Sequence, residues 1–177
     1  AHAARKYGFE GSTSDVPALL NDPGINTVFI TTRPNLHAPM IVAALDAGKH
    51  VFVEKPLATD AAGLEAVIEA HRRNPSLQLM TGFNRRFSPH GVTLREWLNK
   101  RSEPATLTMT INAGQLPPEH WSANLEQSGG RIVGEGCHWF DLISFLADSP
   151  IVRVSSNCGG SADASQGHQT ITLTLAD

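Results

Sequence analysis

Two short apolar runs in the first third of the chain each end in polar residues, and a helical pattern lies between them. Residues 27–32 (TVFITT) and 51–53 (VFV) have the apolar and β-branched content of buried strands. Residues 35–47 carry apolar side chains at helical spacing, and Gly48 follows them as a helix terminator. This order predicts a β-α-β unit whose polar strand ends lie at one edge of a parallel sheet.

The hydrophobic pattern of the remaining chain predicts more helices and a second group of strands. Helices are expected over residues 1–7 up to Gly8, after a cap at Ser14, and over residues 89–100 and 129–147. Strands are expected over residues 105–111, 151–156 and 170–175, with a hairpin loop at 157–167. The chain therefore combines helices and strands in an α/β fold.

Composition and charge exclude several classes of function. The chain has 177 residues, 41% hydrophobic content and a net charge of -3 without long runs of one sign, which predicts a globular protein and argues against binding of nucleic acid or an anionic membrane. No stretch approaches the roughly 20 apolar residues of a membrane span, and no signal-peptide pattern is present, so we expect a cytoplasmic location. Cys137 and Cys158 lack metal-ligand spacing, so we expect reduced, buried thiols and no metal.

The residues directly after the second predicted strand are the first candidates for chemistry. Glu54 and Lys55 place a carboxylate and an ammonium at the carboxyl end of a strand, where open α/β sheets carry their active sites. Pro56 fixes the turn, and a Lys-Pro bond beside an active site can be cis. The alternative interpretation is a solvated strand end followed by a loop proline.

His138 is the second candidate, within the helix predicted over residues 129–147. Residues three and four apart share a helical face, so Glu135, His138 and Asp141 can form a row of acid, imidazole and acid. Carboxylates favour the protonated imidazole and burial opposes it, which suits proton exchange near neutral pH. The alternative is a structural histidine whose ring is satisfied in the core.

Three segments in order carry a resemblance to a known family. They are residues 25–58 (INTVFITTRPNLHAPMIVAALDAGKHVFVEKPLA), 80–89 (MTGFNRRFSP) and 129–142 (GGRIVGEGCHWFDL). Together they resemble the Gfo/Idh/MocA family of NAD(P)-dependent sugar and polyol oxidoreductases. The resemblance implies a partial Rossmann-like nucleotide domain over residues 1–83 and an incomplete α+β open-sheet domain over residues 84–177.

The resemblance also implies which residues act on the substrate and which contact the cofactor. Lys55 would face both nicotinamide and substrate, where its ammonium can stabilise negative charge developing on oxygen, and His138 would carry the proton. Contacts with the nicotinamide half are implied for Thr31, Thr32, Asn35, His37, Glu54, Lys55 and Pro56. Asn35 is also a good helix cap, and the two roles can coexist.

Substrate contacts are expected at the domain junction and on the second domain. The candidates are Asn84, Arg85, Arg86, Trp121, Glu135 and Asp141. Paired guanidinium groups near a cleft can clamp a carboxylate or phosphate, or instead anchor the helix that follows. The Trp121 ring can stack on a sugar or close the core.

One position departs from the family pattern. Most catalytic members carry Asp-x-x-x-His on the helix of His138, and Gly134 stands at the aspartate position here. Glu135 is turned by about 100° from it around a helix, although its longer side chain can partly compensate. The change puts the standard dyad and the usual sugar or inositol substrate in question. The same segment also resembles a subgroup of the family that forms the C-terminal half of longer chains. In those chains the N-terminal half is similar to a zinc-type alcohol dehydrogenase.

The glycine-rich turn of a dinucleotide fold is missing from the sequence. No G-x-G-x-x-G leads from a strand into a helix, so we expect the chain to begin on the order of 40 residues into its nucleotide domain. Further strands are expected after Asp177. The cofactor would be NAD or NADP, bound weakly or not at all by these residues alone.

The sequence thus predicts an oxidoreductase that transfers hydride between a nicotinamide cofactor and a secondary alcohol or ketone of a sugar-like or polyol-like substrate. Its partners would be a small-molecule substrate and further copies of itself, joined through the C-terminal sheet. The alternatives are a non-catalytic member that binds or senses a dinucleotide, motivated by Gly134, and a module that chiefly builds an oligomer.

Overall fold

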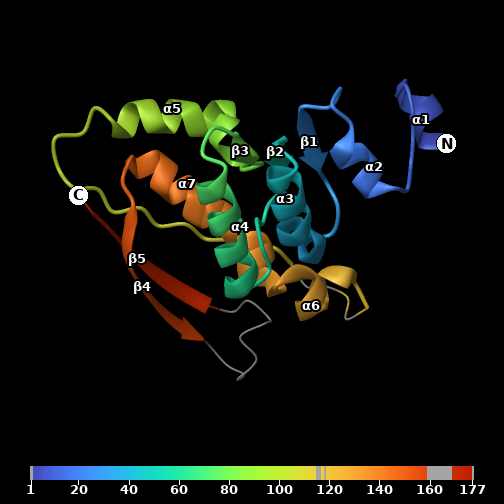
Figure 1. Ribbon diagram of the computed structural model, residues 1–177. Helices are drawn as coiled ribbons and strands as arrows, with labels where there is room; N and C mark the ends of the chain where they lie inside the picture. Colours follow the sequence, from blue (N-terminus) through green and yellow to red (C-terminus); the bar gives the residue numbers. More distant parts are fainter. Residues whose placement is uncertain (1, 115–116, 118, 159–168, 177) are drawn as a thin grey trace.

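A computed structural model describes residues 2–114, 117, 119–158 and 169–176. The first half forms a parallel sheet in the order β1-β2-β3, from β1 (Thr27–Ile30), β2 (His50–Val53) and β3 (Leu79–Thr81). Helices α3 (His37–Asp46) and α4 (Ala61–Arg73) lie over one face of it (Figure 1). The predicted β-α-β unit is confirmed, and Gly48 ends α3 with a left-handed φ of 75°.

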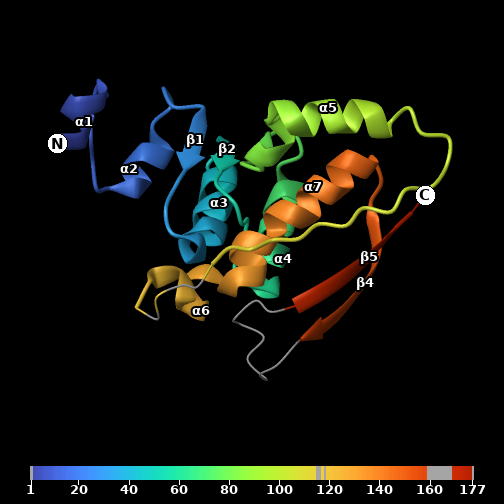
Figure 2. The same ribbon diagram turned by 180° about the vertical axis from the view of Figure 1, so that it is seen from behind.

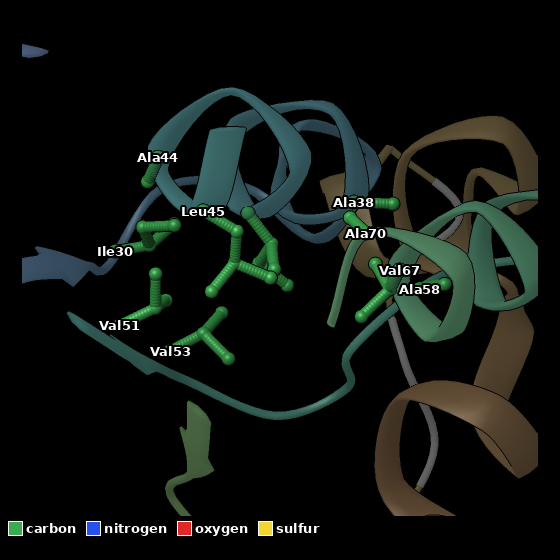
Figure 3. Close-up of a cluster of buried hydrophobic side chains, with 10 residues drawn as sticks. Ile30, Ala38, Ala44, Leu45, Val51, Val53, Ala58, Val67 and Ala70 are labelled. Atoms are coloured by element: carbon green, nitrogen blue, oxygen red, sulfur yellow. The ribbon is translucent and has the colours of Figure 1, made fainter. Parts of the chain in front are cut away.

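The main core fills the space between this sheet and its two helices. Alternate strand residues point inwards, and Figure 3 shows Ile30, Val51 and Val53 directed at Leu45 of α3. On α4, Val67 completes the cluster. Burial of these apolar side chains fixes the two helices on the sheet and thereby fixes the loops at its carboxyl edge.

The opposite face of the sheet carries an apolar row. Phe29, Phe52 and Met80 are paired across the three strands by register, and the two phenyl rings lie 5.2 Å apart. Phe29 is 69% exposed and Met80 49% exposed. The strands of a parallel sheet are usually buried on both faces. This face of the sheet is instead partly exposed.

Helix α4 and strand β3 were not predicted from the sequence. The helix begins after Asp60, whose Oδ1 accepts a hydrogen bond from the amide of Gly63 at 2.7 Å. A Cβ at Gly63 would lie 3.2 Å from the Cβ of Ala38, so the glycine lets α4 approach α3 closely. The aspartate cap before an apolar helical pattern was the available signal.

Two helix starts differ from the prediction. Helix α1 (His2–Tyr7) ends before Gly8 as expected, but α2 (Val16–Asn21) is capped by Asp15, whose Oδ1 accepts from the amide of Ala18 at 3.0 Å, rather than by Ser14.

Asn35 is not a helix cap. Strand β1 stops two residues short of the predicted end, and the 3-10 turn η1 (Pro34–Leu36) begins at the proline, whose fixed φ suits a helix start. Asn35 therefore lies inside a helical turn, and no side chain caps α3.

The second half begins with the turn η2 (Asn84–Phe87) and helix α5 (Pro89–Leu98), which starts at the predicted proline after the Ser88 cap. Residues 105–111 do not form the predicted strand, because no described strand pairs with them. Leu107 and Met109 keep the alternation and are half-buried. This yellow-green segment passes across α7 in Figure 2.

The chain then forms four helical segments and an antiparallel ribbon. They are η3 (Trp121–Ala123), α6 (Leu125–Ser128), the π-helical turn η4 (Ile132–Gly136), α7 (Cys137–Ala147), β4 (Ile151–Cys158) and β5 (Gln169–Leu175). The last two predicted strands are confirmed, although β4 extends two residues further into the predicted loop. The rest of that loop falls outside the described residues.

Within the described ranges, no helix has both the length and the apolar character needed to cross a membrane.

Candidate active site

A cavity of about 380 Å³ lies at the carboxyl edge of the parallel sheet, between the two halves of the chain. Its walls come from the loops after β1 and β2 and from the segment that contains η3, α6 and η4. The predicted site residues that line it are Thr31, Thr32, His37, Glu54, Lys55, Pro56, Trp121 and Glu135. Those outside its lining are Asn35, Asn84, Arg85, Arg86, His138 and Asp141.

Lys55 crosses from one half of the chain to the other. It follows β2, forms a cis peptide bond with Pro56 and is half-buried. Its Nζ donates a hydrogen bond to the main-chain carbonyl of Gly134 at 2.6 Å. An ammonium carries three N–H donors, so among the described residues two remain for a ligand in the cavity.

The acceptor of that bond belongs to the π-helical turn η4. Such turns occur often at functional sites and release or redirect main-chain groups. A Cβ at Gly134 would lie 3.2 Å from the carbonyl oxygen of Ser128, so the glycine is tightly placed. The position at which the family pattern leads us to expect an aspartate therefore offers Lys55 a main-chain carbonyl rather than a carboxylate.

The predicted row of Glu135, His138 and Asp141 is not connected by hydrogen bonds. The π-helical turn takes more residues per turn than an α-helix, so Glu135 does not follow α-helical spacing to His138. Glu135 instead accepts from Arg131 at 3.3 Å. Asp141 forms a two-pronged ion pair with Arg86, whose Nε lies 2.7 Å from Oδ2.

His138 is buried on α7, and its Nδ1 is inaccessible and has no hydrogen-bond partner. Its ring meets Phe83 edge-on at 6.2 Å. Burial lowers the pKa of His138 from its ordinary value of 6.5, and the positive charges of Lys55 and Arg85 lower it further, while Asp141 opposes them. The imidazole is therefore neutral at pH 7 and lies within the electrostatic reach of Lys55.

The turn η2 is attached to α7 through its two arginines. The Arg85 guanidinium lies 4.0 Å from the centroid of the Trp139 ring, and Arg86 pairs with Asp141. Asn84 is exposed at the start of the turn. Arg86 thus anchors the junction in this structure, which is the alternative the sequence left open, and its role as a substrate ligand stays a prediction.

His37 is the most buried polar side chain of the cavity wall, at 1% exposure. Its Nδ1 lies 2.7 Å from the carbonyl oxygen of Pro56, and its Nε2 lies 3.1 Å from that of Thr32. Both ring nitrogens therefore face main-chain carbonyls of the two loops. Its predicted contact with a cofactor stays a prediction.

Trp121 contacts the first half of the chain through Arg33. The Arg33 guanidinium lies 4.9 Å from the centroid of its ring and donates to Gln127 Oε1 at 3.1 Å. The ring is 38% exposed and borders the cavity.

Sequence reasoning did not select several of the residues in the cavity wall. Ser128 is buried beside the left-handed Gly129-Gly130 turn, and Arg131 joins Glu135 to the carbonyl of Gly114. The spacing of Arg131 and Glu135, four residues apart, was the available signal.

No group of three or more potential metal ligands occurs in the part of the chain that the structure describes. Cys137 is a free thiol beside the site, and burial raises its pKa, so the thiol is protonated at neutral pH.

Comparisons with known proteins agree with this geometry. The sequence model of an oxidoreductase family with an NAD-binding Rossmann fold matches residues 1–83. Levoglucosan dehydrogenase of Pseudarthrobacter phenanthrenivorans is 31% identical over 153 residues, which cover 82% of this chain and 39% of that protein. Myo-inositol 2-dehydrogenase of Thermotoga maritima is 30% identical over 151 residues, which cover 84% and 44%.

Solved structures extend the likeness to nearly the whole chain. A levoglucosan dehydrogenase in complex with NADH and levoglucosan has a TM-score of 0.81 and 25% identity, and the match covers 99% of this chain and 51% of that chain. An oxidoreductase domain protein from Kribbella flavida has a TM-score of 0.80 and 25% identity, and the match covers 99% of this chain and 52% of that chain. The chain spans less than half the length of the two curated relatives and about half that of these structures.

Proposed function

Because the chain belongs to the Gfo/Idh/MocA family of oxidoreductases, we propose that the whole protein transfers a hydride between a nicotinamide cofactor and a secondary alcohol or ketone of a sugar-like or polyol-like substrate. One observation carries the proposal: the Lys55 ammonium reaches across the cavity to η4 at 2.6 Å and keeps two donors free. Relatives named as inositol and levoglucosan dehydrogenases support the substrate class.

The cavity fits the nicotinamide end of a dinucleotide. It lies at the carboxyl ends of β1 and β2, where open α/β sheets bind such ligands, and Thr31 and Thr32 offer polar groups at its floor. When bound, the nicotinamide ring would accept the hydride from the alcohol carbon. Thr31, Thr32, Glu54 and Lys55 would hold that ring against the substrate.

Two side chains would act on the substrate oxygen. Lys55 would donate a hydrogen bond to it and stabilise the negative charge that develops as hydride leaves. The neutral His138 can accept the hydroxyl proton, since its pKa is lowered and its Nδ1 has no other partner. The His138 ring lies outside the cavity lining and its Nδ1 is inaccessible, so this step needs a shift of the ring that exposes Nδ1 to the cavity.

A substrate screen of the full-length protein tests the proposal. We expect NAD⁺ or NADP⁺ to be reduced with at least one of myo-inositol, scyllo-inositol, levoglucosan and a set of aldoses, at about 1 s⁻¹ or faster. Absorbance at 340 nm measures the reaction, and omission of the polyol is the control. Folded protein without turnover on any of them would refute the dehydrogenase.

Gly134 supports a second candidate, a member that binds or senses a dinucleotide without turnover. Its carbonyl, rather than a carboxylate, contacts Lys55. The same screen separates the candidates, because a sensor would bind dinucleotide without reducing it.

Light scattering on the whole protein tests the third idea, association through the sheet that contains β4 and β5.

We also expect the 177-residue chain by itself to bind a dinucleotide weakly or not at all. Its sequence contains no glycine-rich turn between a strand and a helix, and such turns hold the pyrophosphate with main-chain amides. Isothermal titration calorimetry with NADH and NADPH measures the affinity, with the full-length protein as the comparison. Micromolar affinity of the short chain would contradict this expectation, and the choice between the two cofactors rests on the same titration of the whole protein.

A further inference from the structure

Two loops form the floor of the candidate active site. The main-chain hydrogen bonds between the two strands end before the loops reach the cavity. The loop after β1 contains Thr32, and the loop after β2 contains Lys55 and Pro56. The last main-chain bond between the strands runs from the amide of Glu54 to the carbonyl of Ile30 at 2.9 Å. Among the described residues, no main-chain hydrogen bond joins the two loops beyond that point.

His37 bridges this gap with its side chain. Its Nδ1 lies 2.7 Å from the carbonyl oxygen of Pro56 and its Nε2 lies 3.1 Å from that of Thr32. The ring comes from the first residue of α3, whose packing on the sheet is fixed by the core. It is 1% exposed, so its two ring nitrogens are shielded from bulk water.

We infer that His37 is a positioning residue, whose ring ties the two loops together and so fixes Lys55 for reaction with the substrate. The inference rests on the proposed function and adds to it. Pro56 is bonded directly to Lys55, so the orientation of the Pro56 carbonyl sets the direction in which the lysine leaves the loop. Displacement of a reacting group by about 1 Å can cost 10²-fold in rate.

The two contacts of the ring nitrogens can be tested separately. The amide nitrogen of asparagine can occupy the position of histidine Nδ1, and that of glutamine the position of Nε2. His37→Asn therefore keeps a donor for Pro56, and His37→Gln keeps one for Thr32. His37→Phe keeps an aromatic ring and loses both ring nitrogens.

Steady-state kinetics of the full-length enzyme should rank the three variants. We expect His37→Phe to lower kcat by about 10–100-fold with little change in KM for the polyol, since Lys55 acts mainly in the transition state. His37→Asn should recover most of the loss and His37→Gln little of it, because the Pro56 bond is the one next to Lys55. Rates are normalised to folded enzyme, which removes any loss due to unfolding alone.

Hydrogen exchange provides a readout that does not depend on activity. In His37→Phe, peptides covering residues 31–36 and 54–58 should exchange faster, while those of the sheet core around Val28 and Val51 should not change. Wild-type kcat in His37→Phe, recovery by Gln rather than Asn, or unchanged local exchange would overturn the inference. A wild-type protein without dehydrogenase activity would refute the proposed function instead, and the exchange measurement would still decide whether His37 joins the loops.

Discussion

Replacing Lys55 by methionine is expected to lower kcat/KM of the full-length enzyme by about 10²–10³-fold, the loss typical of removing one donor that stabilises developing negative charge. Methionine keeps a side chain of similar length, so the packing of the half-buried stem changes little. The bond from Nζ to the Gly134 carbonyl and the two free donors disappear together. Steady-state rates with the best polyol from the screen measure the effect.

The loss should fall on kcat more than on KM, because the interaction strengthens as negative charge develops on the substrate oxygen. Lys100→Met is the matched control, since Lys100 is exposed beyond the end of α5 and does not line the cavity. This control should retain wild-type rates. A Lys55 variant as active as the control would contradict the role that we assign to the ammonium.

The sequence predicted the elements that local pattern decides. Apolar residues such as Ile30, Val51 and Val53 alternate along β1 and β2, and their burial under α3 follows directly from that pattern. Residues 105–111 alternate equally well and form no strand, because a strand also needs a neighbour with free main-chain groups. Pairing is a property of the whole sheet, and the alternation of one segment cannot report it.

The candidate site was predicted less completely, for a related reason. A position at the end of a strand was enough to select Glu54 and Lys55, but the contact from Lys55 to Gly134 joins residues 79 apart and has no local signal. The π-helical turn η4 was also hidden, since an apolar pattern at helical spacing does not show where one residue is inserted. That insertion separates Glu135 from the row expected with His138 and Asp141.

His138 is expected to be the second group whose loss slows turnover strongly. His138→Asn should lower kcat by about 10²-fold or more, because the alcohol proton then has no acceptor beside the lysine. We expect kcat/KM of the wild type to decrease at acidic pH as His138 becomes protonated. In the His138→Asn variant this decrease should be absent. A pH profile of alcohol oxidation at saturating cofactor measures both effects. Unchanged rates and an unchanged acid limb in His138→Asn would show that another group accepts the proton.

The position of that acid limb follows from the charges around the imidazole. Burial, then the cations Lys55 and Arg85, lower the pKa of His138 below its ordinary 6.5, so the wild type should lose activity only as the pH falls through that lowered value. Arg85→Gln removes one cation, which raises the pKa and moves the limb to higher pH. Arg85→Lys keeps the charge and loses the stacking on Trp139, so its limb should stay in place. A limb that moves equally in both variants would mean that the Trp139 contact, rather than the charge of Arg85, controls the proton acceptor.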